Sequence, residues 1–147
     1  MTDAAAPQPA IKVLLVEDSL PNRDMLTRRL ERRGFVVRGA EDGPTGVAMS
    51  VSEMPDVILM DIALGAMDGW EATQLIKTRP STAHIPIIAL TAHALTGDRE
   101  KSFEVGCADF DTKPVDFARL VQKIRACLTS ARARTETARG LGPGLGP

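Results

Sequence analysis

Apolar residues gather in short runs along the chain, and polar or turn residues follow each run. Runs such as Val13–Val16 and Val57–Met60 are continuously apolar, which is typical of parallel strands buried on both faces of a sheet. We therefore expect five strands, at Ile11–Val16, Phe35–Arg38, Asp56–Asp61, Ile85–Thr91 and Cys107–Asp111.

Segments with helical spacing of apolar residues separate these runs. Pro21 lies where a first turn tolerates a missing N–H, Asp68 and Glu71 have the spacing of a capping box, and Asp116 is a candidate N-cap. We expect helices from about Ser19 to Gly34, around Val47 and Val51, from Asp68 through Ile76, over Thr96–Glu104 and over Phe117–Leu128. Strands that alternate with helices predict an α/β domain with a doubly wound, five-stranded parallel sheet.

The two ends of the chain differ in composition from this core. Residues 1–10 are rich in Ala and Pro, and residues 130–147 combine scattered arginines with Gly-Pro repeats, so we expect both to be disordered around a folded domain at residues 11–129. Cys107 and Cys127 have no metal-binding spacing, which indicates buried or inert thiols.

Charge and hydropathy narrow the choice of partners. The chain has 18 basic and 19 acidic residues and a formal net charge of −1, which indicates neither nucleic acid nor a membrane surface as partner. No signal peptide and no apolar run of about 20 residues occurs, so we expect a cytoplasmic protein with protein partners.

Chemically matched residues stand where four of the predicted strands end. Glu17 and Asp18 follow the first strand, Asp61 ends the third, Thr91 ends the fourth and Lys113 follows the fifth. Because parallel strands share a carboxyl edge, these side chains should meet in one cleft. Clustered carboxylates suit Mg²⁺, an aspartate can attack phosphorus, and a lysine and a threonine can bind phosphate oxygens. The set predicts a phosphoryl acceptor site.

From about Lys12 to Leu128 the chain resembles the receiver domains of two-component response regulators, and Met67-Asp68-Gly69 matches the loop that follows their acceptor. The resemblance implies a flavodoxin-like sheet with strand order 2-1-3-4-5. It implies that Glu17, Asp18 and Asp61 hold Mg²⁺ and that Asp61 takes a phosphoryl group from a phosphohistidine. Thr91 and Lys113 complete the site, and the Lys113–Pro114 bond is expected to be cis.

The same resemblance makes Thr91 and Phe110 the switch residues, although a core position on the fifth strand also explains Phe110. Three positions depart from the family pattern: Gly65 replaces a frequent proline, and Ala63 and His93 stand where the phosphoryl lifetime is tuned. The resemblance implies a histidine kinase or histidine phosphotransfer protein as partner, and a downstream protein partner.

Three other classes of protein share part of this pattern. A dehalogenase-like phosphohydrolase needs an acid two residues after Asp61, where this chain has Ala63, and a flavodoxin needs a phosphate loop where this chain is acidic. A pseudo-receiver scaffold that works without phosphorylation stays open. The prediction is a stand-alone receiver, a non-enzymatic adaptor or phosphorelay intermediate.

Overall fold

The computed structural model describes residues 9–93 and 97–145, with side chains as far as Ala131. Its five parallel strands form one sheet in the order β2-β1-β3-β4-β5, which confirms the expected topology. Val13 lies beside both Val37 and Val57, and Leu59 lies beside Ile88. The strands are β1 (Lys12–Val16), β2 (Val36–Ala40), β3 (Val57–Asp61), β4 (Ile87–Thr91) and β5 (Asp109–Thr112).

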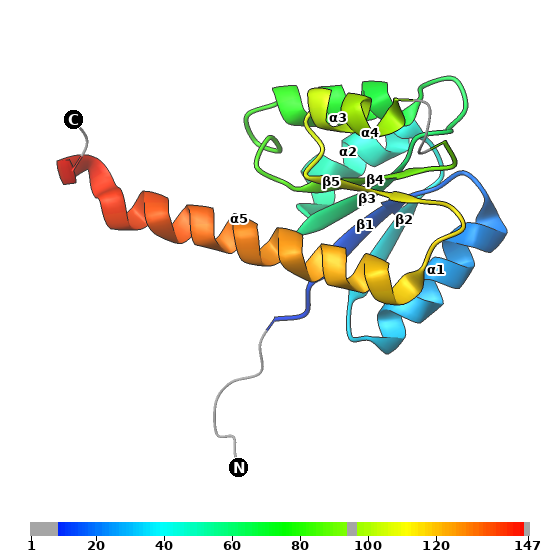
Figure 1. The fold of residues 1–147 in the computed structure, drawn as a ribbon, viewed down its shortest axis with the longest axis horizontal. Coiled ribbons are helices and arrows are strands. Elements are labelled where there is room, and N and C mark those ends of the chain that lie inside the picture. Colours follow the sequence, from blue (N-terminus) through cyan, green and yellow to red (C-terminus); the bar gives the residue numbers. More distant parts are fainter. Residues whose placement is uncertain (1–8, 94–96, 146–147) are drawn as a thin grey trace, which may run out of the picture.

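Helices cover both faces of the sheet (Figure 1). One side carries α1 (Leu20–Arg32) and α5 (Phe117–Leu145), and the other carries α2 (Gly43–Glu53), α3 (Gly69–Thr78) and α4 (Asp98–Glu104). Side chains alternate between the faces along each strand, so Leu15 and Leu59 pack with α1 and α5, whereas Leu14 and Ile58 belong to the core on the other side. This burial on two faces explains why the strands are continuously apolar.

Side-chain caps fix where several helices begin. The carboxylate of Asp68 accepts the N–H of Glu71 at 2.9 Å, and the carboxylate of Asp116 accepts the N–H of Arg119 at 3.1 Å. Both N-caps agree with the sequence prediction, and Pro21 lies in the first turn of α1 as expected. These caps place the start of α3 directly behind the loop after β3, and the start of α5 behind the loop after β5.

Some element boundaries differ from the sequence prediction. β4 begins at Ile87 rather than Ile85, because Pro86 has no N–H to donate to a neighbouring strand. β5 begins at Asp109 rather than Cys107, whose N–H instead donates to the carbonyl of Ser102 in the turn after α4. β2 runs to Ala40, two residues past its expected end at Arg38.

The largest difference concerns the end of the chain. α5 continues to Leu145, so residues 130–145 are helical rather than disordered as the composition suggested. Ala, Arg and Glu in residues 130–139 are good helix formers, and extending a helix avoids the cost of nucleating a new one. Figure 1 shows this part of α5 running beyond the sheet. The expected disorder of residues 1–8 and 146–147 lies outside the described residues.

The cysteines are buried, as expected for inert thiols. Burial raises the pKa of the Cys107 thiol to about 11, so this thiol stays protonated at neutral pH. In the described part of the chain, none of the helices has the length and apolar character that crossing a bilayer requires.

Candidate functional site

The carboxyl edge of the sheet brings the predicted acidic residues together. Glu17 and Asp18 follow β1, and Asp61 is the last residue of the adjacent strand β3. Each of the three offers a carboxylate oxygen, and these oxygens lie within 4.8 Å of one another. In the strand order 2-1-3-4-5 the chain adds β2 on one side of β1 and the later strands on the other side. The switch point therefore lies between β1 and β3, which is where open α/β sheets bind their ligands.

Lys113 reaches this cluster from the loop after β5. Its Nζ lies 2.9 Å from Asp61 Oδ2 and 3.1 Å from Glu17 Oε1. Burial by itself lowers the pKa of Lys113, but the hydrogen bonds and charges of Asp61 and Glu17 outweigh it and raise the pKa above its usual value. The ammonium therefore stays charged at neutral pH. The peptide bond from Lys113 to Pro114 is cis, as the resemblance predicted.

Asp61 is 2% exposed and is held on both carboxylate oxygens. Oδ2 accepts from Lys113, and Oδ1 accepts the backbone N–H of Ala63 at 3.0 Å. The start of α3 closes on the loop behind it, because the N–H of Gly69 donates to the carbonyl of Ile62 at 3.0 Å. A Cβ atom at position 69 would lie 2.4 Å from the carbonyl oxygen of Asp61, so any side chain here would force the backbone to shift.

The two acidic residues after β1 have different surroundings. Glu17 is 1% exposed, and its carboxylate accepts from both Lys113 and the N–H of Ser19. Asp18 is exposed, and among the described residues no hydrogen bond or ion pair reaches its carboxylate. The carboxylate oxygens of Asp18 are therefore available to a ligand, whereas the carboxylate of Glu17 already stabilises the loop after β1.

The donor set fits a hard divalent cation. Three carboxylates face one lysine, so the cluster carries excess negative charge, and every available ligand atom is oxygen. Mg²⁺ prefers such ligands and keeps further positions for water or phosphate oxygens. The residues that would hold it are Glu17, Asp18 and Asp61, as predicted from the sequence.

Of the two expected switch residues, Thr91 ends β4 at this edge of the sheet, whereas Phe110 lies further back on β5, beside Ala89. The hydroxyl of Thr91 bonds to the carboxylate of Asp98 at the start of α4, and it accepts the N–H of His93 at 3.0 Å. Phe110 is half-buried and meets Phe103 edge to face, with 6.3 Å between the ring centroids. Thr91 thus engages α4 rather than Asp61 in this structure.

Comparison with known families decides what this arrangement is. A family model for the response regulator receiver domain matches residues 13–125. The chain belongs to this family. The match contains β2 to β5, all of β1 except Lys12, and all the predicted functional residues.

Individual relatives of the receiver domain agree with this assignment. Protein PilH of Pseudomonas aeruginosa is 38% identical over 117 residues, which cover 80% of this chain and 97% of PilH. Response regulator PleD of Caulobacter vibrioides is 37% identical over 115 residues, but this chain spans only 25% of PleD. The transcriptional activator IrlR of Burkholderia pseudomallei is 35% identical, and this chain spans 54% of it.

A solved structure of another receiver domain is also similar to this chain. The receiver domain of the sensor histidine kinase PA1611 from Pseudomonas aeruginosa PAO1 is 35% identical, with a TM-score of 0.77 over 82% of this chain and 99% of that chain. That structure contains a magnesium ion coordinated in its active site cleft. That active site cleft and the acidic cleft of this receiver domain occur on the same fold.

The positions that depart from the family pattern are open to solvent. Ala63 and Gly65 are exposed in the loop after Asp61, and an added Cβ at Gly65 would meet no atom of the described residues within 4 Å. His93 contributes its backbone N–H to Thr91. The sequence analysis did not predict the contact between Asp98 and Thr91, because it placed Asp98 only within a helix. The available signal was an acidic residue in the first turn of that helix, seven residues after Thr91.

The different surroundings of Glu17 and Asp18 lead to a prediction about Mg²⁺ affinity. Asp18→Asn should weaken Mg²⁺ binding by roughly 10- to 100-fold and leave the melting temperature nearly unchanged, because Asp18 bonds to no described residue. Glu17→Gln should lower the melting temperature as well, because it weakens the contact with Lys113. Calorimetric titration and thermal melts check both. Equal Mg²⁺ affinity in Asp18→Asn and the unsubstituted protein would contradict the assignment.

Proposed function

We propose that this receiver domain takes a phosphoryl group onto Asp61 from a phosphohistidine, in a reaction that requires Mg²⁺. The observation that carries the proposal is Asp61 itself, which lies buried between an acidic cluster and the ammonium of Lys113. A carboxylate in this position can attack phosphorus, and the cation beside it can bind the phosphoryl oxygens.

In the proposed step a carboxylate oxygen of Asp61 forms a bond to phosphorus while the bond from phosphorus to the imidazole nitrogen breaks. The electron pair of that bond stays on the imidazole nitrogen, and the histidine leaves as a neutral ring because its other nitrogen already carries a proton or the departing nitrogen takes one from water. Lys113 supplies a positive charge next to Asp61 Oδ2. Mg²⁺ bound by Glu17, Asp18 and Asp61 would neutralise negative charge on the phosphoryl group.

The phosphorylated domain would act by binding a protein partner or by passing on its phosphoryl group, and would catalyse no reaction on another substrate. We propose that the phosphorylated domain is a switched adaptor or a relay intermediate in the cytoplasm, with a histidine kinase or histidine phosphotransfer protein upstream and a protein partner downstream. Its enzymatic role would be limited to its own phosphorylation and dephosphorylation. The match over 97% of PilH supports a single-domain protein, whereas PleD and IrlR are much longer than the matched region.

Intact-mass spectrometry tests this proposal directly. After incubation with acetyl phosphate and Mg²⁺, the protein should gain the mass of one phosphoryl group, and EDTA should abolish the gain. Failure to gain mass from acetyl phosphate and from a phosphorylated histidine kinase would instead support the pseudo-receiver alternative, in which partners bind without phosphorylation.

A second prediction concerns the switch. Thr91→Ala should leave Asp61 phosphorylatable but blunt the structural response, because the hydroxyl that now bonds to Asp98 is the group expected to bond to the phosphoryl oxygen. A shift in populations from about 1:99 to 99:1 needs roughly 5.5 kcal/mol, so losing one charge-assisted hydrogen bond is substantial. Amide chemical shifts of residues 97–125 after beryllofluoride addition check this. Identical shifts in Thr91→Ala and the unsubstituted protein would contradict the coupling.

A further inference from the structure

A buried aspartate that the proposed chemistry does not use lies two residues before Lys113. Asp111 is 2% exposed, and it stands on β5 beside Leu90 of β4, next to the core shared with α5. Its Oδ1 accepts from Arg119 Nε at 3.0 Å, from Arg119 Nη2 at 2.7 Å and from the N–H of Thr112 at 2.8 Å. Its Oδ2 is buried and has no hydrogen-bond partner among the residues that the structure describes. Arg119 is therefore the cation that compensates this carboxylate.

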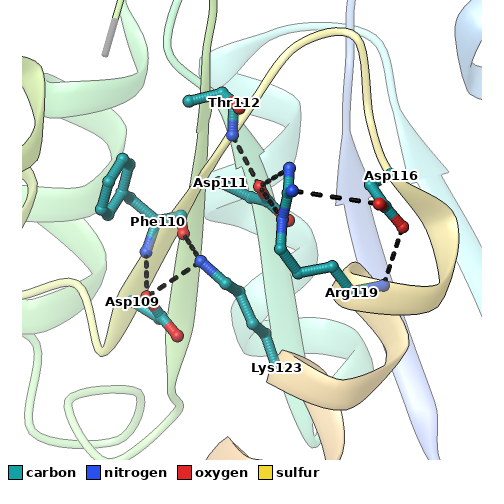
Figure 2. Close-up of polar contacts among 7 residues, drawn as sticks. All are labelled: Asp109, Phe110, Asp111, Thr112, Asp116, Arg119 and Lys123. Atoms are coloured by element: carbon teal, nitrogen blue, oxygen red, sulfur yellow. Dashed lines mark hydrogen bonds and ion pairs between the residues drawn. The ribbon is translucent and has the colours of Figure 1, made fainter. Parts of the chain in front are cut away.

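Arg119 also contacts the other end of the same segment. Asp116 caps α5 by accepting the N–H of Arg119, and its Oδ2 lies 3.9 Å from Arg119 Nη1. Figure 2 shows the guanidinium between the carboxylates of Asp111, at the end of β5, and Asp116, at the start of α5. The residues between these two carboxylates include Lys113, so Arg119 closes the base of the loop that delivers the ammonium to Asp61.

This closure matters because β5 is an edge strand. On its inner side the N–H of Lys113 donates to the carbonyl of Thr91 at 2.8 Å, but no strand of the described chain pairs with β5 on its outer side. Along that outer side the N–H of Thr112 donates to the carboxylate of Asp111, and the same carboxylate accepts a hydrogen bond from Arg119 (Figure 2). The end of β5 is thus held by β4 from one side and by Arg119 from the other.

We propose that Arg119 is a positioning residue for phosphoryl transfer: by joining Asp111 to Asp116 it holds Lys113 against Asp61. The inference rests on the proposed function, since it assigns Lys113 a part in the reaction. Small displacements of a catalytic group can slow a reaction by up to ~100-fold, so a loosened loop should affect the rate before it affects the fold.

The test removes the Asp111–Arg119 pair as a unit. Arg119→Met alone would leave the buried carboxylate of Asp111 unpaired and destabilise the protein, whereas Asp111→Val together with Arg119→Met leaves no unpaired buried charge at this place and should fold normally. We expect this double variant to keep its melting temperature and Mg²⁺ affinity and to be phosphorylated by acetyl phosphate about tenfold more slowly. Phosphorylation at the unsubstituted rate would overturn the proposal.

Lys123→Met is the matched control. Lys123 lies one turn further along α5 and also ties this helix to β5, through the carbonyl of Phe110 and the carboxylate of Asp109, 3.5 Å away (Figure 2). These contacts lie before Asp111 and leave the loop that carries Lys113 untouched. Lys123→Met should therefore be phosphorylated at the unsubstituted rate, and an equal loss in both variants would show that general docking of α5 is responsible, which overturns the specific role of Arg119.

Lys113→Met separates this inference from the function it rests on. In that background, the added Asp111→Val and Arg119→Met substitutions should cause no further slowing, because the group that they position is absent. A further tenfold loss would overturn the positioning role. No slowing by Lys113→Met itself would show that the proposed role of Lys113 fails, and no phosphorylation of the unsubstituted protein would show that the proposed function fails.

A structural readout does not depend on activity. A crystal structure of the variant with Asp111→Val and Arg119→Met should show Lys113 Nζ beyond hydrogen-bond distance, about 3.5 Å, of Asp61 Oδ2. An unchanged position of Nζ would overturn the inference even if the rate had fallen.

Discussion

Asp61→Asn should abolish phosphorylation of this receiver domain by either acetyl phosphate or a phosphorylated kinase. An amide oxygen is a far weaker nucleophile than a carboxylate and cannot give the same acyl phosphate. The substitution also removes one of the three carboxylates that would hold Mg²⁺. The fold should persist, because the amide can still accept the N–H of Ala63 at the same place.

Asp68→Asn is the matched control for this prediction. Asp68 lies in the same loop but caps α3 instead of facing the acidic cluster, and asparagine caps a helix as well as aspartate does. Intact-mass spectra should therefore show one added phosphoryl group in Asp68→Asn and none in Asp61→Asn. Residual phosphorylation of Asp61→Asn at the unsubstituted rate would place the acceptor on another residue and refute the proposed function.

Gly69→Ala should lower the free energy of unfolding by about 2 kcal/mol. The added Cβ would lie 2.4 Å from the carbonyl oxygen of Asp61 and 2.7 Å from the Cα of Ile62, and both are backbone atoms that cannot move aside cheaply. Overpacking costs typically about 1–3 kcal/mol, which exceeds the gain of at most about 1 kcal/mol that alanine offers over glycine in a helix. The acceptor loop must shift, so phosphorylation should slow as well.

Gly65→Ala provides the comparison within the same loop. In the described part of the chain no atom lies within 4 Å of a Cβ added at position 65, so this substitution should change stability by no more than about 0.5 kcal/mol. Urea unfolding measures the difference between the two variants, and acetyl phosphate kinetics measures the effect on the site. If Gly69→Ala were as stable and as reactive as Gly65→Ala, the close approach of α3 to the acceptor would have no consequence.

The carboxyl-edge site was predictable because it depends on a repeated local pattern. Each apolar run specifies a buried strand, and parallel strands place the residues that follow them on one edge, so Glu17, Asp61 and Lys113 were expected to meet before any contact was known. The N-caps at Asp68 and Asp116 were predictable for the same reason, since a cap and the N–H it accepts lie three residues apart.

Other features were decided only by tertiary packing. Glu17 and Asp18 are neighbours of similar chemistry, yet Glu17 is buried and Asp18 is exposed, and the loop after β5 brings Lys113 to the carboxylate of Glu17. The bond of Thr91 to Asp98 depends on where α4 docks, and the grip of Arg119 on Asp111 depends on where α5 lies against an edge strand. Sequence periodicity determined which residues line the sheet and its reactive edge. The partner of each polar side chain was decided by the packing of helices on the sheet, because that packing brings together groups that no local pattern relates.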